Sequence, residues 1–389
     1  MESTNDSRTA RIVCIAGAVA LVLGAIGWAL QLSGGLLAGS SMTNIFLWGL
    51  MIAMFAFLVG FGAGSQIVAS AIYAFGKEEL KPIARIAAAC GLACVGAAGV
   101  AIIADLGAVR NIMAMIFGLN LRSPLAWDML AITAFIVVSI VQLVLIARDA
   151  PSARVWAIIA GVFAILLQIV EGLLFSTQTA HAWWATPIMP VDFLVVAFVS
   201  GCALMLLVAC GKGAQASAIS WIGRLCAWAI AIHLVLALCD LALVAMEGTP
   251  ESGGVLAAIQ ANILLYVCEL VLPAIAMVLL FVNGKKGAVS LAITASILTI
   301  VGIFVHRLML LYPSYNAPSL YLTLSGTNDV TGAYPISTGR YLDWDQTFAL
   351  GTPYMPAGLE WLACLLPIGF AAVATIIILW VMGKLAPRR

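Results

Sequence analysis

The sequence predicts an all-α polytopic membrane protein of about ten transmembrane helices, arranged as two four-helix bundles and two flanking helices. Three observations support this fold class. Of the 389 residues, 64% are hydrophobic and only 9% are charged, whereas a soluble domain carries about 25% charged residues. Many apolar runs are long enough to cross a hydrocarbon core of about 30 Å as a helix. Lysine and arginine gather in alternate loops between these runs, as they do in membrane proteins.

The predicted spans follow one another along the whole chain. They cover residues 11–33, 44–75, 82–106, 124–147, 153–176, 190–211, 218–246, 255–282, 285–312 and 357–384. The first is too long for the apolar part of a signal peptide, so we expect it to be retained. Bases precede the first span, follow every second span and close the chain, with Arg110, Arg122 and Arg340 as exceptions. This pattern and the even number of spans place both termini in the cytoplasm.

A faint internal repeat indicates how the spans are grouped. An offset of 135 residues superimposes Ser65 on Ser200, Asp105 on Asp240 and Glu171 on His306. Such polar residues are rare inside spans, although chance matching in a biased composition is an alternative. We therefore expect an N-terminal tail and flanking helix (1–43), a first bundle (44–176), a second bundle (177–312), an outer loop (313–356), and a last flanking helix with a cytoplasmic tail (357–389).

The loop at 313–356 is the one long connection between predicted spans. A loop of this length in a tight bundle is either disordered or a docking surface. It is rich in tyrosine, and disordered segments are usually poor in aromatic residues. We therefore expect an ordered loop that contacts a partner protein. The net charge of +1 gives no reason to expect nucleic acid.

Ionisable residues inside spans are costly and are functional candidates by default. Counted at about 1.5 Å per helical residue, most of them fall in the outer half of the predicted bundles, and only His233 and Glu269 fall near mid-depth. Interfacial capping explains Asp192 and Glu360, and it is an alternative for Asp128. Structural polar packing is the alternative for Glu171, His233 and Glu269.

Redox cofactors find little support in this chain. All nine cysteines fall in apolar runs without a CxxC pair, which disfavours an iron–sulfur cluster. Of the three histidines, His181 lies in a loop, and His233 and His306 differ in predicted depth, which disfavours a haem with two axial histidines. The glycine-rich segment 60–65 lies inside a span, where small residues permit close helix packing rather than phosphate binding.

The order of several short motifs resembles one known family. GAGS at 62–65, KPIAR at 81–85, ADLG at 104–107 and SPLAWD at 123–128 resemble the first half of the NrfD/polysulfide-reductase (PsrC-type) membrane-anchor family. WWATPIMPVDF at 183–193, SGCAL at 200–204, HRLML at 306–310 and PYMPAGLEW at 353–361 resemble its ten-span branch, which includes membrane subunits of hydrogenase-2-type complexes and of alternative complex III. The family continues DLG with Arg-Pro, and this chain has Ala108-Val109-Arg110 instead, so that arginine's role carries over only if Arg110 replaces it.

The resemblance implies a quinone-binding electron-transfer subunit in the cytoplasmic (inner) membrane of a bacterium or archaeon. It implies that a periplasmic ferredoxin-like iron–sulfur subunit exchanges electrons with menaquinone or ubiquinone, and that this chain holds no haem or cluster. The catalytic partner would be a molybdopterin enzyme, a nickel–iron hydrogenase or a protein of the cytochrome c type, in anaerobic respiration for example. Whether this subunit itself reacts with quinone or is a purely structural anchor stays open.

Two groups of residues follow as candidate sites. Asp105, Asp128 and Glu171 are the candidate catalytic groups at a quinone, with Ser65 and Trp127 completing a binding pocket in the first bundle. A candidate proton pathway in the second bundle consists of His233, Asp240, Glu269, His306 and Arg307. The alternative is a secondary transporter, because ten spans, a repeat and Glu269 close to Pro273 would also suit one.

Overall fold

The computed structural model describes residues 2–34, 39–42, 48–106, 113, 117–179, 181–316, 321–323, 331–333 and 354–386. Ten helices within these ranges are long and apolar enough to cross a membrane. They are α1 (Glu2–Gly34), α2 (Leu50–Ala74), α3 (Lys81–Asp105), α5 (Pro124–Ala147), α6 (Ala153–Ser176), α7 (Met189–Gly211), α8 (Ala216–Glu247), α10 (Ile263–Asn283), α11 (Val289–Asn316) and the consecutive pair α12 (Gly358–Ala363) and α13 (Leu365–Leu385). The predicted fold class, an all-α multi-pass membrane protein, is confirmed.

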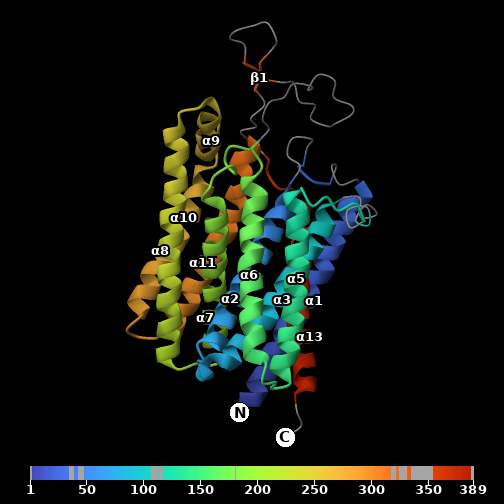
Figure 1. Cartoon of the computed structure of the whole chain (residues 1–389), viewed down its shortest axis with the longest axis vertical. Coiled ribbons are helices and arrows are strands. Elements are labelled where there is room, and N and C mark those ends of the chain that lie inside the picture. The colour runs from blue at the N-terminus through green and yellow to red at the C-terminus, as the bar shows by residue number, and fades with distance from the viewer. Residues whose placement is uncertain are drawn as a thin grey trace.

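The long helices run side by side, and both termini lie at the same end of the molecule, here called the terminal end (Figure 1). The opposite end, called the loop end, carries a short helix α9 (Pro250–Ala261) and a small antiparallel hairpin of β1 (Tyr321–Thr323) and β2 (Thr331–Ala333). A 3₁₀ turn, η1 (Glu78–Leu80), joins α2 to α3 at the terminal end. Placement of the termini in the cytoplasm stays a prediction.

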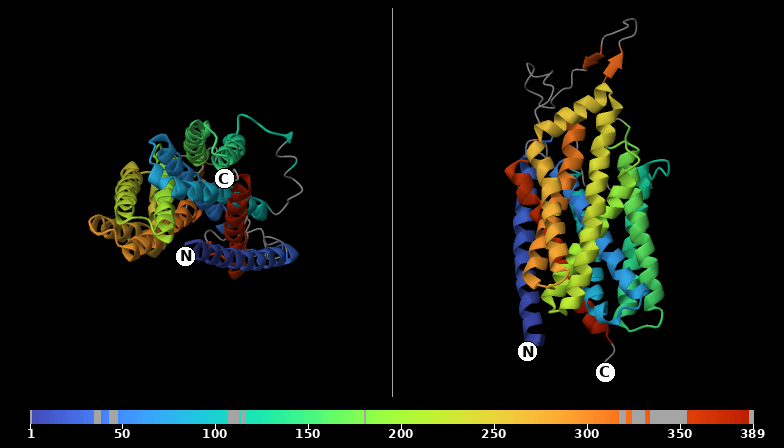
Figure 2. Two further views of the ribbon diagram at one scale, coloured as in Figure 1. Left: turned by 90° about the horizontal axis from the view of Figure 1, so that it is seen from below. Right: turned by 90° about the vertical axis from the view of Figure 1, so that its left-hand side faces the viewer.

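Helix contacts define which spans are neighbours. α2 packs against α3, α6 and α7, while α10 packs against α8 and α11. α1 pairs with α13, and α13 in turn lies against α3 (Figure 2). α2 is the most buried of the long helices, because it contacts helices from both halves of the chain.

The structure corrects the boundaries of two predicted spans. The apolar run 255–282 is not one helix, because the chain turns at Asn262, whose side-chain amide donates to the Ala258 carbonyl, and α10 begins only at Ile263. The preceding helix α9 packs its apolar side against α11 instead of crossing the membrane. The α11 helix also continues through Pro313 to Asn316, so the outer loop begins later than residue 313.

Most of the predicted docking loop lies outside the described residues, as do Gly107, Arg110 and Arg340. The expectation of a docking surface therefore stays a prediction. Where the chain is described again, Tyr354 donates to the Glu360 carboxylate and accepts from the Leu50 amide. This contact joins the end of the loop to the start of α2.

α2 and α7 cross in direct backbone contact at Gly64 and Gly201. A Cβ atom on Gly64 would lie 1.7 Å from the Ala197 carbonyl oxygen, a distance that no side chain can adopt. The prediction that the segment 60–65 serves close packing is confirmed. Beside this crossing, the Ser65 hydroxyl donates to the Phe61 carbonyl at 2.6 Å, and the Ser200 hydroxyl donates to the Val196 carbonyl at 2.9 Å. The same bond therefore recurs at the 135-residue offset, where the two repeats would meet.

The backbone contact at Gly64 predicts that an alanine substitution destabilises the protein at this position but not at a glycine with open space around it. Gly64→Ala forces α2 and α7 apart, and overpacking of this kind costs about 1–3 kcal/mol. Gly99→Ala on α3 is the matched control, because nothing lies within 4 Å of the Cβ it would add. Thermal unfolding of the purified protein should show a lower Tm for Gly64→Ala and an equal or higher Tm for Gly99→Ala. Equal Tm values for Gly64→Ala and the wild type would contradict the crossing.

Candidate functional site

A proline and a glycine bring α10 and α11 together at the centre of the second half of the chain. The Pro273 ring fills the space that Gly302 leaves open, since a Cβ on Gly302 would lie 2.7 Å from the ring atoms Cγ and Cδ. One turn nearer the loop end, Glu269 and His306 face each other, and His306 Nδ1 lies 2.7 Å from Glu269 Oε1. The close helix approach therefore sets the position of this pair.

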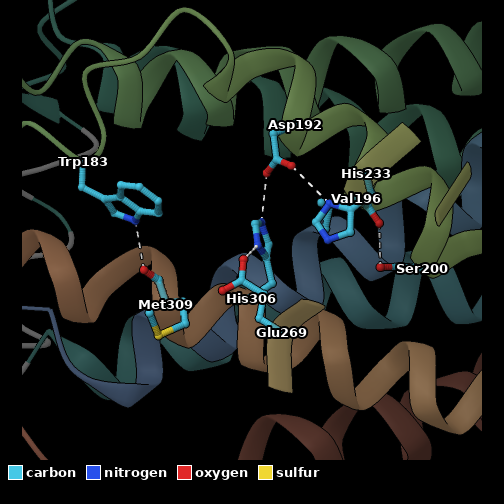
Figure 3. A network of polar contacts seen from close by, with 8 residues as sticks. All are labelled: Trp183, Asp192, Val196, Ser200, His233, Glu269, His306 and Met309. Atoms are coloured by element: carbon cyan, nitrogen blue, oxygen red, sulfur yellow. Dashed lines mark hydrogen bonds and ion pairs between the residues drawn. The ribbon is translucent and has the colours of Figure 1, made fainter. Parts of the chain in front are cut away.

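A second carboxylate links two histidines. Asp192, in the first turn of α7, lies 2.9 Å from His306 Nε2 and 3.3 Å from His233 Nδ1 (Figure 3). The two imidazole rings meet edge to face, with centroids 4.9 Å apart. Glu269, His306, Asp192 and His233 thus form a continuous network that draws one residue from each of α10, α11, α7 and α8. All are buried except His306, whose side chain is 13% exposed.

The chemistry of this network of four residues suits proton exchange. Both ring nitrogens of His306 face carboxylate oxygens, and a carboxylate accepts but does not donate hydrogen bonds. His306 is therefore an imidazolium, or one of its two carboxyl partners holds the proton. Either arrangement places a proton between two acceptors at hydrogen-bond distance.

The central role of Asp192 differs from the expectation of an interfacial cap. The residue is 7% exposed and bridges both histidines. The sequence shows only that a histidine inside a span needs a polar partner. Which carboxylate supplies it depends on how the helices pack. Glu360, by contrast, matches the expected cap: it accepts from the backbone amides of Ala357 and Ser41 at 2.7 and 3.0 Å.

Arg307 lies fully buried beside this network, and it lacks a hydrogen-bond partner among the described residues. Its guanidinium carbon stacks 3.9 Å from the centroid of the Phe193 ring, a cation–π contact. The carboxylates that act on it electrostatically are Glu171, Asp192 and Glu269. Arg307 therefore interacts with acidic groups from both the first and the second half of the chain.

The acidic group of the first half is small and buried. Glu171 is 0% exposed and accepts from the Gln168 amide at 3.0 Å through Oε2, while its Oε1 atom has no partner among the described residues. Asp128 is 2% exposed and is close enough to interact electrostatically with Glu171. The structure thus brings together Asp128, Glu171 and Arg307.

The other candidate residues of the predicted quinone pocket lie apart from that group. Asp105, at the end of α3, is half-buried, and the charged residue that acts on it is Glu360. Trp127 is 53% exposed, and its indole donates to the Leu121 carbonyl. Ser65 is bonded within its own helix. The five residues do not form one contact group in the described structure, and their role at a quinone stays a prediction.

A small cavity of about 30 Å³ extends the second network through Asp240 and Tyr266. Asp240 Oδ1, the Tyr266 hydroxyl and Glu269 Oε2 are buried and have no partner among the described residues. The volume suffices for about one or two water molecules, and buried polar atoms of this kind are usually satisfied by water. Every residue of the predicted proton pathway therefore lies in, or next to, one polar cluster.

Neutral polar residues at the terminal end were missed, because only ionisable groups were considered as candidates. Gln66, Ser139 and Gln142 are 0% exposed, and each has at least one side-chain atom without a partner among the described residues. They lie in the half of the bundle that has few ionisable side chains inside its spans. Their uncharged side chains gave no signal in a count of acids and bases.

Two tryptophans hold the α6–α7 loop in place on the loop-end side of the network. Pro313 has no N–H, so it cannot donate to the Met309 carbonyl four residues earlier. The Trp183 indole donates to this carbonyl at 3.0 Å (Figure 3), and Trp184 donates to the next one, Leu310, at 2.6 Å. His181, in the same loop, packs 4.3 Å from the Trp184 ring, and burial lowers its pKa below the usual value, so it is neutral at pH 7.

Comparison with known proteins identifies the family. The NrfD family, described as "Polysulphide reductase, NrfD", matches residues 39–319. The chain therefore belongs to the NrfD family, as its motifs predicted, and it is an integral multi-pass membrane protein.

Three curated relatives are similar to parts of the chain. A protein of Halobacterium salinarum, described as a membrane subunit of dimethyl sulfoxide reductase, is 31% identical over 49% of each chain. The Hdr-like menaquinol oxidoreductase integral membrane subunit of Archaeoglobus fulgidus is 27% identical over 43% of this chain and 42% of the relative. A selenate reductase subunit of Mesobacillus selenatarsenatis is 22% identical over 48% of this chain and 53% of the relative. The chain spans about half the length of these relatives.

The hydrogen bond from the Trp183 indole to the Met309 carbonyl predicts that the loss of stability on substituting Trp183 depends on whether residue 313 is proline. Trp183→Phe leaves the Met309 carbonyl unsatisfied, and a buried unsatisfied group costs about 1–3 kcal/mol. In a Pro313→Ala background the new N–H can satisfy the same carbonyl, so Trp183→Phe should lower Tm by less than it does in the wild type. Thermal unfolding of the four proteins measures this difference. Equal losses in both backgrounds would contradict the proposed compensation.

Proposed function

We propose that this chain is the membrane subunit of a quinone-linked oxidoreductase complex and that its buried charges serve the proton side of quinone chemistry. One observation carries the proposal: buried ionisable side chains lie within electrostatic reach of one another, from Asp128 and Glu171 through Arg307 to the hydrogen-bonded Asp192–His306–Glu269 network. Burying so many ionisable groups is costly, which favours a functional use. Family membership and the menaquinol oxidoreductase relative support a quinone as the substrate.

The names of the relatives indicate which partners this chain would have. The relatives are named as subunits of reductases or oxidoreductases, so a separate catalytic subunit would complete the complex. We propose that a ferredoxin-like iron–sulfur subunit docks on the loop end and exchanges electrons with the quinone, menaquinone or ubiquinone. In this arrangement the terminal end faces the cytoplasm and the loop end the periplasm. The clusters belong to the partner, and this chain handles quinone and protons.

Charge balance explains how the site would hold protons. The buried carboxyl groups of Asp128, Glu171, Asp192 and Glu269 share one guanidinium, and Arg307 does not lose its proton in a protein. Neutrality in the apolar interior therefore requires three protons on the remaining carboxyl and imidazole groups. Reduction of a quinone takes up two electrons and two protons. Asp128 and Glu171 would donate protons to the quinone oxygens, and the histidine network would supply replacements across Arg307.

Arg307 would couple the two groups without carrying a proton. When Glu171 gives up its proton, its new negative charge attracts the guanidinium. The attraction weakens the hold of Arg307 on Asp192 and Glu269, and these groups then bind protons more tightly. The absence of a hydrogen bond to Arg307 among the described residues leaves the guanidinium able to respond to either side.

A secondary transporter is less well supported. The Glu269 carboxylate close to Pro273 would be its candidate ion site, but His306 already engages that carboxylate at 2.7 Å. The adjoining cavity of about 30 Å³ has room for water rather than for an organic solute. The geometry therefore favours a proton-handling role for this residue.

Substitution of the acidic residues tests the quinone site. General acid catalysis contributes about 10²–10⁴-fold, so Glu171→Gln should lower kcat for quinone turnover by about two orders of magnitude, with the complex still assembled. We expect a similar loss for Asp128→Asn, which removes the other proposed proton donor. Lys286→Gln, which removes an exposed charge from the α10–α11 turn at the terminal end, is the control and should leave turnover unchanged. Near-normal turnover in an assembled Glu171→Gln or Asp128→Asn complex would remove that residue from the site.

Substitution of His306 tests the proton pathway. Glutamine keeps a hydrogen-bonding side chain but cannot be protonated near neutral pH, so His306→Gln should abolish quinone-linked pH changes in proteoliposomes while some quinone turnover persists. His181→Gln is the matched control, because that histidine lies in the loop and outside the network. If wild-type proteoliposomes with verified turnover show no pH change, the network is a packed polar core without transport.

A further inference from the structure

The terminal end contains a large cavity that the proposed function does not use. Its volume is about 1020 Å³, and it is bounded by the α2–α3 turn, the α5–α6 turn and the α7–α8 turn. It therefore lies across the seam between the first and second halves of the chain. Leu379 of α13 closes one side.

The cavity lies at the depth of lipid headgroups. Leu379 precedes Trp380, which is 63% exposed, and the Lys384 ammonium lies 5.5 Å from the centroid of the Trp380 ring. Exposed tryptophan paired with lysine is typical of the membrane–water interface. A phospholipid in the leaflet at the terminal end would therefore carry its phosphate at the level of this cavity.

Both signs of charge line the cavity in equal number. Arg85, Lys81 and Lys212 stand against Glu78, Glu79 and Asp149. Arg85 is half-buried and has no hydrogen bond or ion pair among the described residues, whereas Lys81 is bound to Glu78 at 2.6 Å. The Arg85 guanidinium, next to the buried Tyr73, is thus an available cation, and the exposed Glu79 is an acid on the rim.

The remaining wall is apolar, with Ile86, Ile146 and Leu379 facing the same space. A ligand that fits would combine a hydrocarbon tail, a phosphate for Arg85 and a hydrogen-bonding cation for the acidic rim. A free phosphate makes no use of the apolar wall. An anionic lipid leaves the exposed Glu79 uncompensated, and a choline headgroup has no N–H to donate to a carboxylate.

We propose that this cavity binds a zwitterionic phospholipid with a primary ammonium headgroup, of the phosphatidylethanolamine type. Its phosphate pairs with Arg85, its ammonium donates to the acidic rim at Glu79, and a chain lies along Ile86 and Ile146. Because the cavity joins turns from both halves of the chain, the bound lipid holds α3 against the α7–α8 turn. It stabilises the folded protein as any ligand of the native state does.

Thermal unfolding of the delipidated full-length protein tests the proposal. Phosphatidylethanolamine should raise Tm, and stepwise N-methylation of the headgroup to phosphatidylcholine should remove the effect, since each methyl replaces a donor. Phosphatidylglycerol and inorganic phosphate should raise Tm less. Equal shifts with phosphatidylcholine, or a larger shift with phosphatidylglycerol or phosphate, would overturn the assignment. This series needs no variant and does not depend on quinone activity.

Variants locate the site. Loss of a charge-assisted hydrogen bond weakens binding about tenfold or more, so Arg85→Gln should show that decrease in apparent affinity for phosphatidylethanolamine by titration and native mass spectrometry. Arg85→Lys keeps the charge but loses the planar fork, and it should retain part of the affinity. Lys286→Gln, an exposed base of the α10–α11 turn outside the cavity, is the matched control. Unchanged affinity in Arg85→Gln, or an equal loss in Lys286→Gln, would place the lipid elsewhere.

Discussion

The bilayer interior admits a charged side chain only with partners, and this constraint shapes the centre of the molecule. Arg307 is fully buried, and it is offset by the Phe193 ring and by carboxylates on both sides. His306 is held between Asp192 and Glu269. These groups come from four different helices, so each helix must take its place before the charges are satisfied. The polar network therefore specifies the helix arrangement and provides the chemistry.

Glycine and proline set the helix spacing that the network requires. Gly302 admits the Pro273 ring, and that approach places His306 against Glu269 one turn away. Gly64 and Gly201 bring α2 to α7, and Asp192 lies in the first turn of the same helix α7. Pro313 leaves a carbonyl to which Trp183 bonds, which fixes the α6–α7 loop that leads into α7. Glycine and proline residues in one part of the sequence thus position charged residues in another.

The sequence alone predicted the ten spans, the family and the polar character of the loop end, because hydropathy and charge are local properties of a segment. It predicted the position of Asp192 but not its role, because that role depends on which histidines other helices bring near it. It joined α9 to α10, because both are apolar and only the turn at Asn262 separates them. It grouped Asp105 with Glu171, although each has different charged neighbours, since depth along a helix does not give its rotation.

The central claim is that a quinone binds and reacts at the buried acids of this chain. The quinone content of the purified complex tests this claim most directly. The intact complex would be purified in mild detergent, and the quinone extracted from it would be quantified per chain. It would be compared with the quinone-to-phospholipid ratio of the membranes of origin. A quinone-binding subunit predicts a stoichiometric amount of quinone that exceeds the membrane ratio. Quinone at or below that ratio, in a complex shown to be assembled, would contradict the claim.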